Sequence, residues 1–486
     1  MMSSAKDSSQ HRRFRRRRLT LDDITVVDSA VLKRAVSAAA LGNAMEWFDF
    51  GVYSYIVSTL SQVFFQELPE NMRLIATFAT FAIAFLVRPL GGMFFGPLGD
   101  RVGRQKVLAA TMIIMAVSTF CIGLIPSYAS IGIVAPILLL IARLVQGFST
   151  GGEYGGAATF IAEYSPDRQR GFMGSWLEFG TLGGYVLGAA LVTAITAAMS
   201  PEALLDWGWR IPFFIAGPLG LIGLYLRLKL EETPAFQALE ESAEPQETHS
   251  HSAFFKRLTK HWRELVICVG LVLVFNVTDY MLLSYMPTNL SSNLKYDTHH
   301  GLMMILLVML LMMVIQPFLG LLCDRVGRRP VVMVGCIGTF LLAWPCFMLI
   351  QQGTHLSIFV GLMILAALLN CFTSTMPSTL PALFPTSIRY GALAIAFNVS
   401  VSVFGGTTPL VTAWLIDVTN NLMMPAIYMM GAAAIGFVTI LMTRETANRP
   451  LRGSTPTAAS PEEAQELLEE HRTEEAAPSA SDQLPH

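Results

Sequence analysis

The strongest constraint in this sequence is a stretch that occurs twice, each time between two long apolar runs. The first copy, residues 96–106, reads GPLGDRVGRQK, and the second, residues 320–330, reads GLLCDRVGRRP. Asp100 and Asp324 hold the same place in the two copies and lie nearly half the chain apart. Because glycine permits a tight reversal and arginine stays in water, each copy is expected to connect two helices. Two copies with matching flanks indicate an internal repeat, with several membrane helices in each half.

The composition is that of a membrane protein. Hydrophobic residues make up 53% of the 486 residues, charged residues only 14%, and the mean hydropathy is +0.52. A soluble domain of this length is far less apolar. The net charge of −2 gives no reason to expect a nucleic-acid partner. The six cysteines form no CxxC pair, so neither a disulfide framework nor a metal site is expected, and no cofactor is predicted.

Twelve apolar stretches are long enough to span a bilayer, which takes about 20 helical residues. They fall into two groups of six, so the predicted fold is an all-α integral membrane protein of two six-helix repeats. The predicted spans are 35–64, 73–98, 107–126, 132–162, 171–199, 209–229, 263–290, 301–323, 331–351, 355–384, 391–418 and 423–443. The corresponding parts of the chain are an N-terminal tail (1–34), a first half (35–230), a linker (231–262), a second half (263–444) and a C-terminal tail (445–486).

Lysine and arginine alternate between rich and poor loops along the chain. They crowd into both tails, the two repeated loops and the linker, and the loops in between carry few. Positive residues mark the cytoplasmic side, so both termini are predicted to be cytoplasmic. The arginine cluster at residues 12–18 has two interpretations: it contacts anionic lipid, or it is a solvated run that only sets orientation.

Ionisable residues inside the predicted spans are the main functional signal, because a charge in hydrocarbon is costly unless it is paired or hydrated. Glu46 and Asp49 share one face of the first span. Arg143 and Glu153 are about 15 Å apart along the fourth span and cannot pair with each other. A charge network between the first and fourth spans is the simplest prediction. Static ion pairs that only join helices remain the alternative.

None of the nine histidines lies deep in a span, so a transported proton would be carried by a carboxylate. Asp49 is the first choice because of its mid-depth position. The full set assigned to proton coupling is Asp49, Glu153 and Asp279. Glu178 is a weaker candidate, since its side chain could reach the membrane interface.

The repeated loop resembles the signature of the major facilitator superfamily, in which it connects the second and third helices of each half. Further stretches resemble the metabolite:proton symporters, and most of all their osmosensory proline/betaine transporters. They include LGNAMEWFDFGVYSYI (41–56), QGFSTGGEYGGA (146–157) and ETANRPL (445–451). The similarity runs from about Leu19 to about Pro456.

This resemblance implies a proton-coupled symporter that imports zwitterionic osmoprotectants by alternating access and responds to high osmolality. It places the chain in the bacterial inner membrane, with a zwitterionic solute, a proton and the lipid bilayer as partners. For the carboxylate of a zwitterion we assign Arg143. For its ammonium we assign Glu46 and the aromatic rings of Trp47, Tyr280 and Trp414, through cation–π attraction. Most of these rings could equally pack against neighbouring helices.

The repeated loops are assigned to gating, holding the cytoplasmic ends of the helices together while the site faces outward. The gating residues are Gly96, Asp100, Arg101, Gly103 and Arg104 in the first copy and Asp324, Arg325, Gly327 and Arg328 in the second. Two basic turns that only set topology would explain the arginines, but not the matched aspartates and glycines.

Two departures from the family pattern stand out. Asp279 is a charge that the pattern does not contain; it is either a local ion pair or a change in substrate choice. The C-terminal tail has a capping box at Ser460 and Glu463 but no sustained heptads, so a monomer is expected rather than a coiled-coil dimer.

Other functions are less consistent with the sequence. A dicarboxylate or other organic-acid symporter of the same family remains the alternative, because Arg88 and Arg143 could bind an anion. A membrane enzyme is not predicted, since no nucleophile–base or metal motif is present. A sensor without transport activity would need a soluble output domain, and neither predicted tail is long enough for one.

Overall fold

The computed structural model describes residues 20–102, 104–151, 153–228, 258–386 and 388–476. Gly103 and most of the predicted linker lie outside the described residues. The side chains of Asp100, Arg101 and Arg104 lie outside the description too, although the backbone there, including Gly96, is helical. Of the two predicted gating loops, the structure therefore describes the side chains of the second.

Within the described residues, each of the twelve predicted spans is mainly helical. The first half contains α2 (Ser29–Tyr55), α3 (Val57–Phe64), α4 (Glu70–Leu86), α5 (Arg88–Val102), α6 (Arg104–Leu124), α8 (Val134–Ser149), α9 (Glu153–Tyr164), α10 (Arg170–Ala198) and α12 (Ile211–Leu228). The second half contains α15 (Trp262–Asp279), η4 (Tyr280–Tyr285), α16 (Met286–Thr288), η5 (Asn289–Asn293), α17 (Thr298–Val326), α18 (Arg328–Gln351), α19 (His355–Thr373), α20 (Met376–Ala382), α21 (Arg389–Ser400), η6 (Val401–Gly405), α22 (Thr408–Thr419) and α23 (Met424–Leu441). Short helices α7 (Tyr128–Ile131), α11 (Pro201–Asp206), η2 (Asp167–Gln169) and η3 (Gly208–Arg210) lie in the connections.

Length and composition make most of these helices suitable for a bilayer. Among the described residues, nine are long and apolar enough to cross it, and Ala109–Leu124 and Gly208–Ile222 are shorter apolar helices. The first segment is in neither group, which agrees with its polar Glu46 and Asp49. Large apolar side chains such as Leu356 and Phe318 are exposed, and an outer surface of this kind suits lipid rather than water.

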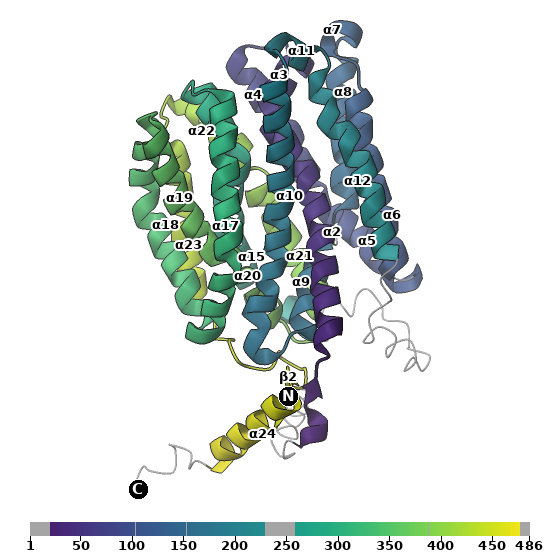
Figure 1. The fold of residues 1–486 in the computed structure, drawn as a ribbon, viewed down its shortest axis with the longest axis vertical. Helices are drawn as coiled ribbons and strands as arrows, with labels where there is room; N and C mark the ends of the chain where they lie inside the picture. The colour runs from purple at the N-terminus through teal and green to yellow at the C-terminus, as the bar shows by residue number, and fades with distance from the viewer. Residues whose placement is uncertain (1–19, 103, 152, 229–257, 387, 477–486) are drawn as a thin grey trace.

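The two halves of the chain lie side by side (Figure 1). Helices up to α12 occupy one side of the bundle, those from α15 onward occupy the other, and α10 packs on both α2 and α17. We call the end where α2 begins and α23 finishes the tail end, and the opposite end, with the loops around residues 65–69 and 294–297, the far end.

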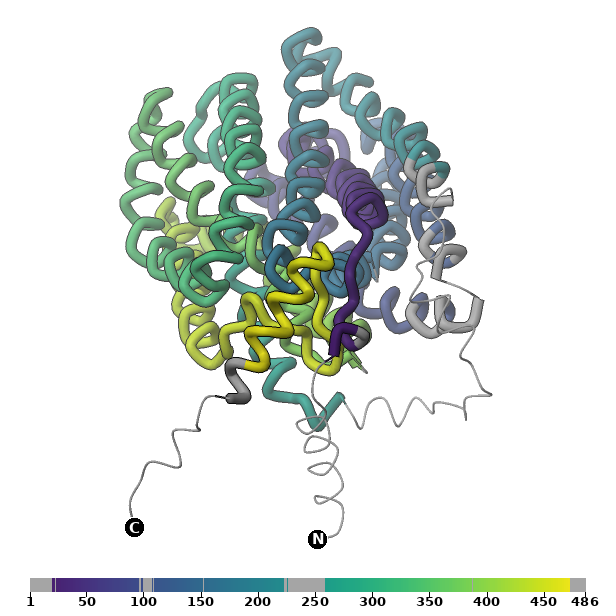
Figure 2. The backbone as a smooth tube through the Cα atoms, turned by 60° about the horizontal axis from the view of Figure 1, so that its bottom comes forward, coloured from purple at the N-terminus to yellow at the C-terminus, as the bar shows by residue number. Residues whose placement is uncertain are grey.

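A small terminal module lies at the tail end, and it was not predicted. β1 (Thr25–Val26) pairs in parallel with β2 (Thr457–Ala458), and α24 (Pro461–Ala476) follows (Figure 2). Ile24, Ala458, Ala464 and Leu468 form its apolar core. The predicted helix start is confirmed, because Ser460 Oγ accepts from the backbone N–H of Glu463 at 3.2 Å.

Candidate transport site

A buried ion pair joins the first and second membrane segments. Arg88 begins α5 directly after the break that ends α4, and its Nη2 donates to Glu46 Oε1 at 2.7 Å. Both side chains are 2% exposed. The break between α4 and α5 brings Arg88 to Glu46 as an ion-pair partner, and the predicted network of Glu46 with the fourth segment stays a prediction. Arg88 is the residue that the sequence-based site assignment missed.

Three rings lie against the Arg88 guanidinium and three more pack on these, and we call all six the aromatic cluster. They are Trp47, Phe50, Phe81, Phe85, Tyr185 and Tyr280, all buried. The Trp47 ring centroid lies 5.4 Å from that of Tyr185 and 5.9 Å from that of Tyr280. The Arg88 guanidinium lies 4.5 Å from the Phe85 centroid and 4.7 Å from the Phe50 centroid. The cluster thus already accommodates a planar cation, which cation–π attraction stabilises.

Asp49 lies in a second polar group, one helical turn from Glu46. Thr119 Oγ1 donates to Asp49 Oδ2 at 2.8 Å, and Gln146 Nε2 donates to the same hydroxyl at 2.8 Å. Arg143 donates to Gln146 in turn, and its guanidinium lies 4.1 Å from the Tyr53 ring centroid. We call Asp49, Thr119, Gln146 and Arg143 the Asp49 relay. It links α2, α6 and α8, so the predicted connection between the first and fourth segments holds for Asp49 and Arg143.

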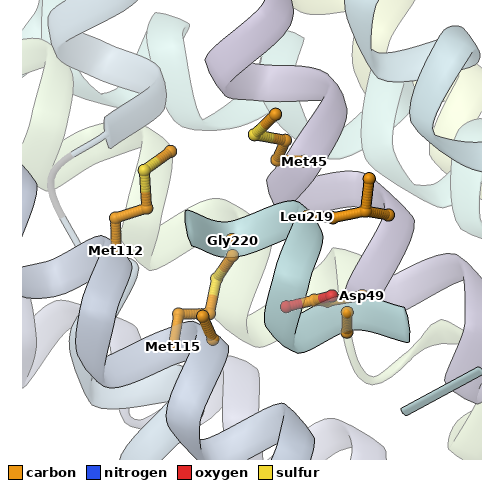
Figure 3. A pocket seen from close by; sticks show the side chains of 8 residues that line it. Met45, Asp49, Met112, Met115, Leu219 and Gly220 are labelled. Atoms are coloured by element: carbon orange, nitrogen blue, oxygen red, sulfur yellow. The ribbon is translucent and has the colours of Figure 1, made fainter. Parts of the chain in front are cut away.

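A small pocket opens beside Asp49, between α2, α6 and α12 (Figure 3). Asp49 is the only charged group among its eight lining residues. The lining residues are Met45, Asp49, Met112, Met115, Ala116, Ala216, Leu219 and Gly220. Methionine side chains adapt easily to small changes of shape. The pocket thus borders the carboxylate with soft apolar walls on the side of these helices.

The other carboxylates are buried and lie apart from the Asp49 relay. Glu153, at the start of α9, accepts a hydrogen bond from Thr111 at 3.1 Å. Glu178 accepts one from the Tyr154 hydroxyl at 2.5 Å and is 1% exposed, so it does not extend to the interface. Asp279 lies at the end of α15, is 3% exposed, and its Oδ1 has no hydrogen-bond partner.

Trp414 was wrongly assigned to the substrate site. Its side chain on α22 is 51% exposed, so it faces the outside of the bundle. Hydropathy cannot distinguish a lipid-facing ring from a cavity-facing one, because both occur on apolar helices. Tyr280 and Trp47, by contrast, belong to the aromatic cluster.

The second gating loop ties the two halves together at the tail end. Asp324 accepts from the backbone N–H groups of Gly171 at 2.7 Å and Phe172 at 2.8 Å, at the N-terminus of α10. A Cβ on Gly171 would lie 2.6 Å from Asp324 Oδ1, so this approach requires glycine. A carboxylate is well placed here, because it meets both the free N–H groups and the positive end of the helix dipole.

The remaining residues of that loop have separate tasks. Gly327 adopts a φ of 100° and separates α17 from α18. Arg328 is 1% exposed and donates to the Ser378 carbonyl at 3.0 Å and to Thr446 Oγ1 at 2.8 Å. Arg325 is exposed, and its predicted part in holding the helix ends together stays a prediction.

The carboxylate of Glu445 supports the same region. It accepts hydrogen bonds from the backbone N–H groups of Arg328, Arg329, Thr446 and Ala447, at 2.8 to 3.1 Å. Burial raises the pKa of this group, but the four N–H groups outweigh burial and hold the pKa below its ordinary value. Glu445 therefore stays ionised and fixes the start of α18 against the segment after α23.

Two helical halves that enclose buried charges, joined across one end by polar contacts, define a secondary transporter of the major facilitator type. The structure of the proton:xylose symporter XylE bound to 6-bromo-6-deoxy-D-glucose has the same fold, with a TM-score of 0.70 at 20% identity over 90% of this chain and 99% of that chain. The partially occluded, inward-open conformation of XylE from E. coli gives a TM-score of 0.67 at 20% identity, over 87% and 100%.

Sequence comparison identifies the family. The sugar (and other) transporter family matches residues 35–250 and 237–456. The "Proline/betaine transporter" of Salmonella typhimurium is 56% identical over 93% of this chain and 91% of its own length. The "Glycine betaine/proline/ectoine/pipecolic acid transporter OusA" of Dickeya dadantii is 56% identical over 95% and 93%, and the "Ectoine/proline transporter ProP" of Corynebacterium glutamicum is 42% identical over 93% and 92%. The chain therefore belongs to the sugar (and other) transporter family, as a multi-pass bacterial membrane protein related to the proline/betaine transporters.

Proposed function

We propose that this protein is a proton-coupled symporter that imports zwitterionic osmoprotectants such as proline and glycine betaine by alternating access. It resides in the bacterial inner membrane as a monomer, and its tail end faces the cytoplasm. The proposal rests on one observation above all. The buried charges form two neighbouring groups, the ion pair of Glu46 with Arg88 inside the aromatic cluster and the Asp49 relay, and Arg143 of the relay lies against Phe50 and Phe81 of the cluster.

The aromatic cluster is the proposed substrate site. A zwitterion carries a carboxylate and an ammonium but no net charge, which suits a site whose own acid and base cancel. Arg88 offers a planar guanidinium for the carboxylate. The rings that now surround that guanidinium, Trp47, Phe50 and Phe85, suit an alkylated ammonium equally well. The names of the relatives, which include proline and betaine transporters, support this substrate class.

The Asp49 relay is the proposed proton site. Asp49 is 4% exposed and contacts a hydroxyl rather than a cation directly, so its proton can come and go without breaking an ion pair. Arg143, three hydrogen bonds away from Asp49 along the relay, stabilises the deprotonated form electrostatically. Arg143 therefore moves in this proposal from substrate binding to proton coupling. Glu153 remains a secondary candidate on α9.

The second gating loop is the proposed inner gate. While the site faces outward, Asp324 keeps the tail end shut by holding the N-terminus of α10, and inward opening releases it. We assign the same task to Asp100, Arg101 and Arg104 of the first copy. High osmolality would then act on the balance between these two states.

A dicarboxylate substrate has less support. A dianion brings two carboxylates and no positive charge of its own, so it would need two buried cations that no acid of the site already balances. Arg88 is paired with Glu46, and Arg143 is bound to Gln146 and lies beside three rings. Placing two further negative charges here would leave the core strongly anionic, which a low dielectric penalises.

The Asp49→Asn variant tests the proposed coupling. Asparagine mimics a permanently protonated carboxyl, so exchange of labelled proline between the two sides of proteoliposomes should persist within about threefold, while accumulation driven by a pH gradient should fall by tenfold or more, about 1.4 kcal/mol. Glu153→Gln is the matched control and should keep accumulation. If Asp49→Asn still accumulates proline and Glu153→Gln does not, the proton travels on α9 and the assignment is wrong.

A further inference from the structure

Two neighbouring polar groups in the middle of the bundle lack a hydrogen-bond partner. They are Oδ1 of Asp279 and the hydroxyl of Tyr280, on side chains that are 3% and 0% exposed. They lie where α15 changes into the π-helical turn η4, and such turns are frequent at functional sites. A buried polar atom without a partner is costly. Two such atoms on successive residues indicate that a polar group of a ligand binds beside them.

The surroundings of this position are aromatic. The Tyr280 ring centroid lies 5.9 Å from that of Trp47 and 5.3 Å from that of Phe85, so Tyr280 belongs to the aromatic cluster. Asp279 lies within electrostatic range of the hydroxyls of Tyr55, Tyr185 and Tyr280. Its carboxylate therefore lies close to the tyrosines that pack between the two halves of the chain.

The balance of buried charges shows what is missing. Glu46 is neutralised by Arg88, and Asp49 is linked to Arg143 through the relay. Glu178 is the acidic group that acts electrostatically on Asp279, and it accepts a hydrogen bond from the Tyr154 hydroxyl. No arginine or lysine among the described residues forms an ion pair with Asp279. An ionised carboxylate in such a place requires a cation, and no side chain of the described residues provides it.

We propose that Asp279 is the counter-charge for the ammonium group of the substrate and restricts the site to zwitterionic or cationic solutes. The substrate then spans the interface, with its carboxylate on Arg88 from the first half and its ammonium on Asp279 from the second. This inference rests on the proposed function and replaces the assignment of Asp279 to proton coupling. It also gives a physical reason for a charge that departs from the family pattern.

A pair of probes of equal shape tests the charge contribution directly. Glycine betaine and 3,3-dimethylbutanoate differ in that carbon replaces the quaternary nitrogen, so only the positive charge is lost. Both are used to inhibit labelled-proline exchange by the full chain in proteoliposomes without a proton gradient. In Asp279→Asn, the inhibition constant for betaine should rise tenfold or more, because a buried charge partner is removed. That for the isostere should stay within about twofold or improve.

The control is Glu67→Gln, which neutralises an exposed acid at the far end and should change neither constant. Should Asp279→Asn fail to reach the membrane, Asp279→Ser provides the same neutralisation with a smaller side chain. An unchanged ratio of the two inhibition constants overturns the proposal. So does loss of gradient-driven accumulation with normal exchange, which would make Asp279 a proton carrier. A wild-type protein that exchanges dicarboxylates but neither proline nor betaine would instead overturn the proposed function itself.

Discussion

The tail end and the far end of the bundle are both closed, but by different kinds of contact. At the tail end the ties between halves include the Asp324 carboxylate on the backbone of α10 and Arg389 Nη1 on Glu163 Oε1 at 2.6 Å, with Arg389 fully buried and Glu163 35% exposed. At the far end, Lys295 meets Glu70 at 3.4 Å with side chains 71% and 79% exposed. Exposed ion pairs contribute about 1 kcal/mol or less, whereas buried charged hydrogen bonds contribute about 1.5–3 kcal/mol.

This difference indicates which end opens more readily. The far end depends on weaker contacts, such as the exposed hydrogen bond from Asn71 to Asp417 and the neutral one between Ser58 and Ser292. The tail end depends on contacts that must be desolvated to form. The empty protein is therefore expected to favour a state that is open at the far end and shut at the tail end, which suits an importer waiting for substrate.

Locking the far end should have the largest effect. The hydroxyl oxygens of Ser58 and Ser292 lie 3.4 Å apart across the two halves, so cysteines at both positions are near enough to form a disulfide. Oxidation of the double variant Ser58→Cys/Ser292→Cys should abolish proline uptake, and a reductant should restore it. Each single variant is the control. Normal uptake with the disulfide fully formed would mean that the far end does not open during transport.

Weakening the tail end should have a smaller but clear effect. Asp324→Asn replaces a charged acceptor with a neutral amide, at a cost of about 1–3 kcal/mol in the closed state. Uptake should fall severalfold while membrane insertion stays normal, and cysteines near α10 should react faster with reagents from the tail side. Asp297→Asn is the matched control, because Asp297 caps α17 at the exposed far end through the N–H of His300 at 2.8 Å. Equal losses in both variants would contradict the comparison.

The terminal module should contribute least. Arg168 pairs with Glu466 at 2.9 Å and with Glu470 at 2.6 Å, and both glutamates are 64% exposed. Arg168→Gln should change proline uptake by less than about twofold at high salt, where these pairs are screened, and most at low salt. Uptake is measured in proteoliposomes over a range of internal salt concentrations. A large loss that does not depend on salt would give α24 a stronger role in closure than its surface contacts indicate.

Much of the fold was predictable because it depends on local windows of sequence. The helix boundaries lie within several residues of the predicted spans, since each span is set by its own apolar run and polar ends. The second gating loop was placed correctly at the junction of α17 and α18. The capped start of α24 at Ser460 was found in the same way, from residues that are neighbours along the chain.

The candidate site was predicted only in part. Glu46, Trp47, Asp49 and Tyr280 were selected, because charges and rings inside apolar spans stand out. Arg88 was noted only as a possible anion site, since its pairing with Glu46 depends on the break between α4 and α5. Trp414 was selected for the same reason as Trp47, but its side chain is exposed, whereas that of Trp47 is buried.

The sequence by itself determined that this chain crosses the membrane repeatedly, that its halves repeat, and which acidic and aromatic residues lie within the spans. Only the tertiary structure decided that Glu46 pairs with Arg88, that Asp49 reaches Arg143 through two other side chains, and that Thr25 pairs with Thr457 near the other end of the chain. Hydropathy and motifs act over tens of residues along one segment. Which side chain meets which depends on how each helix is rotated and broken against its neighbours, and that is a property of the packed molecule.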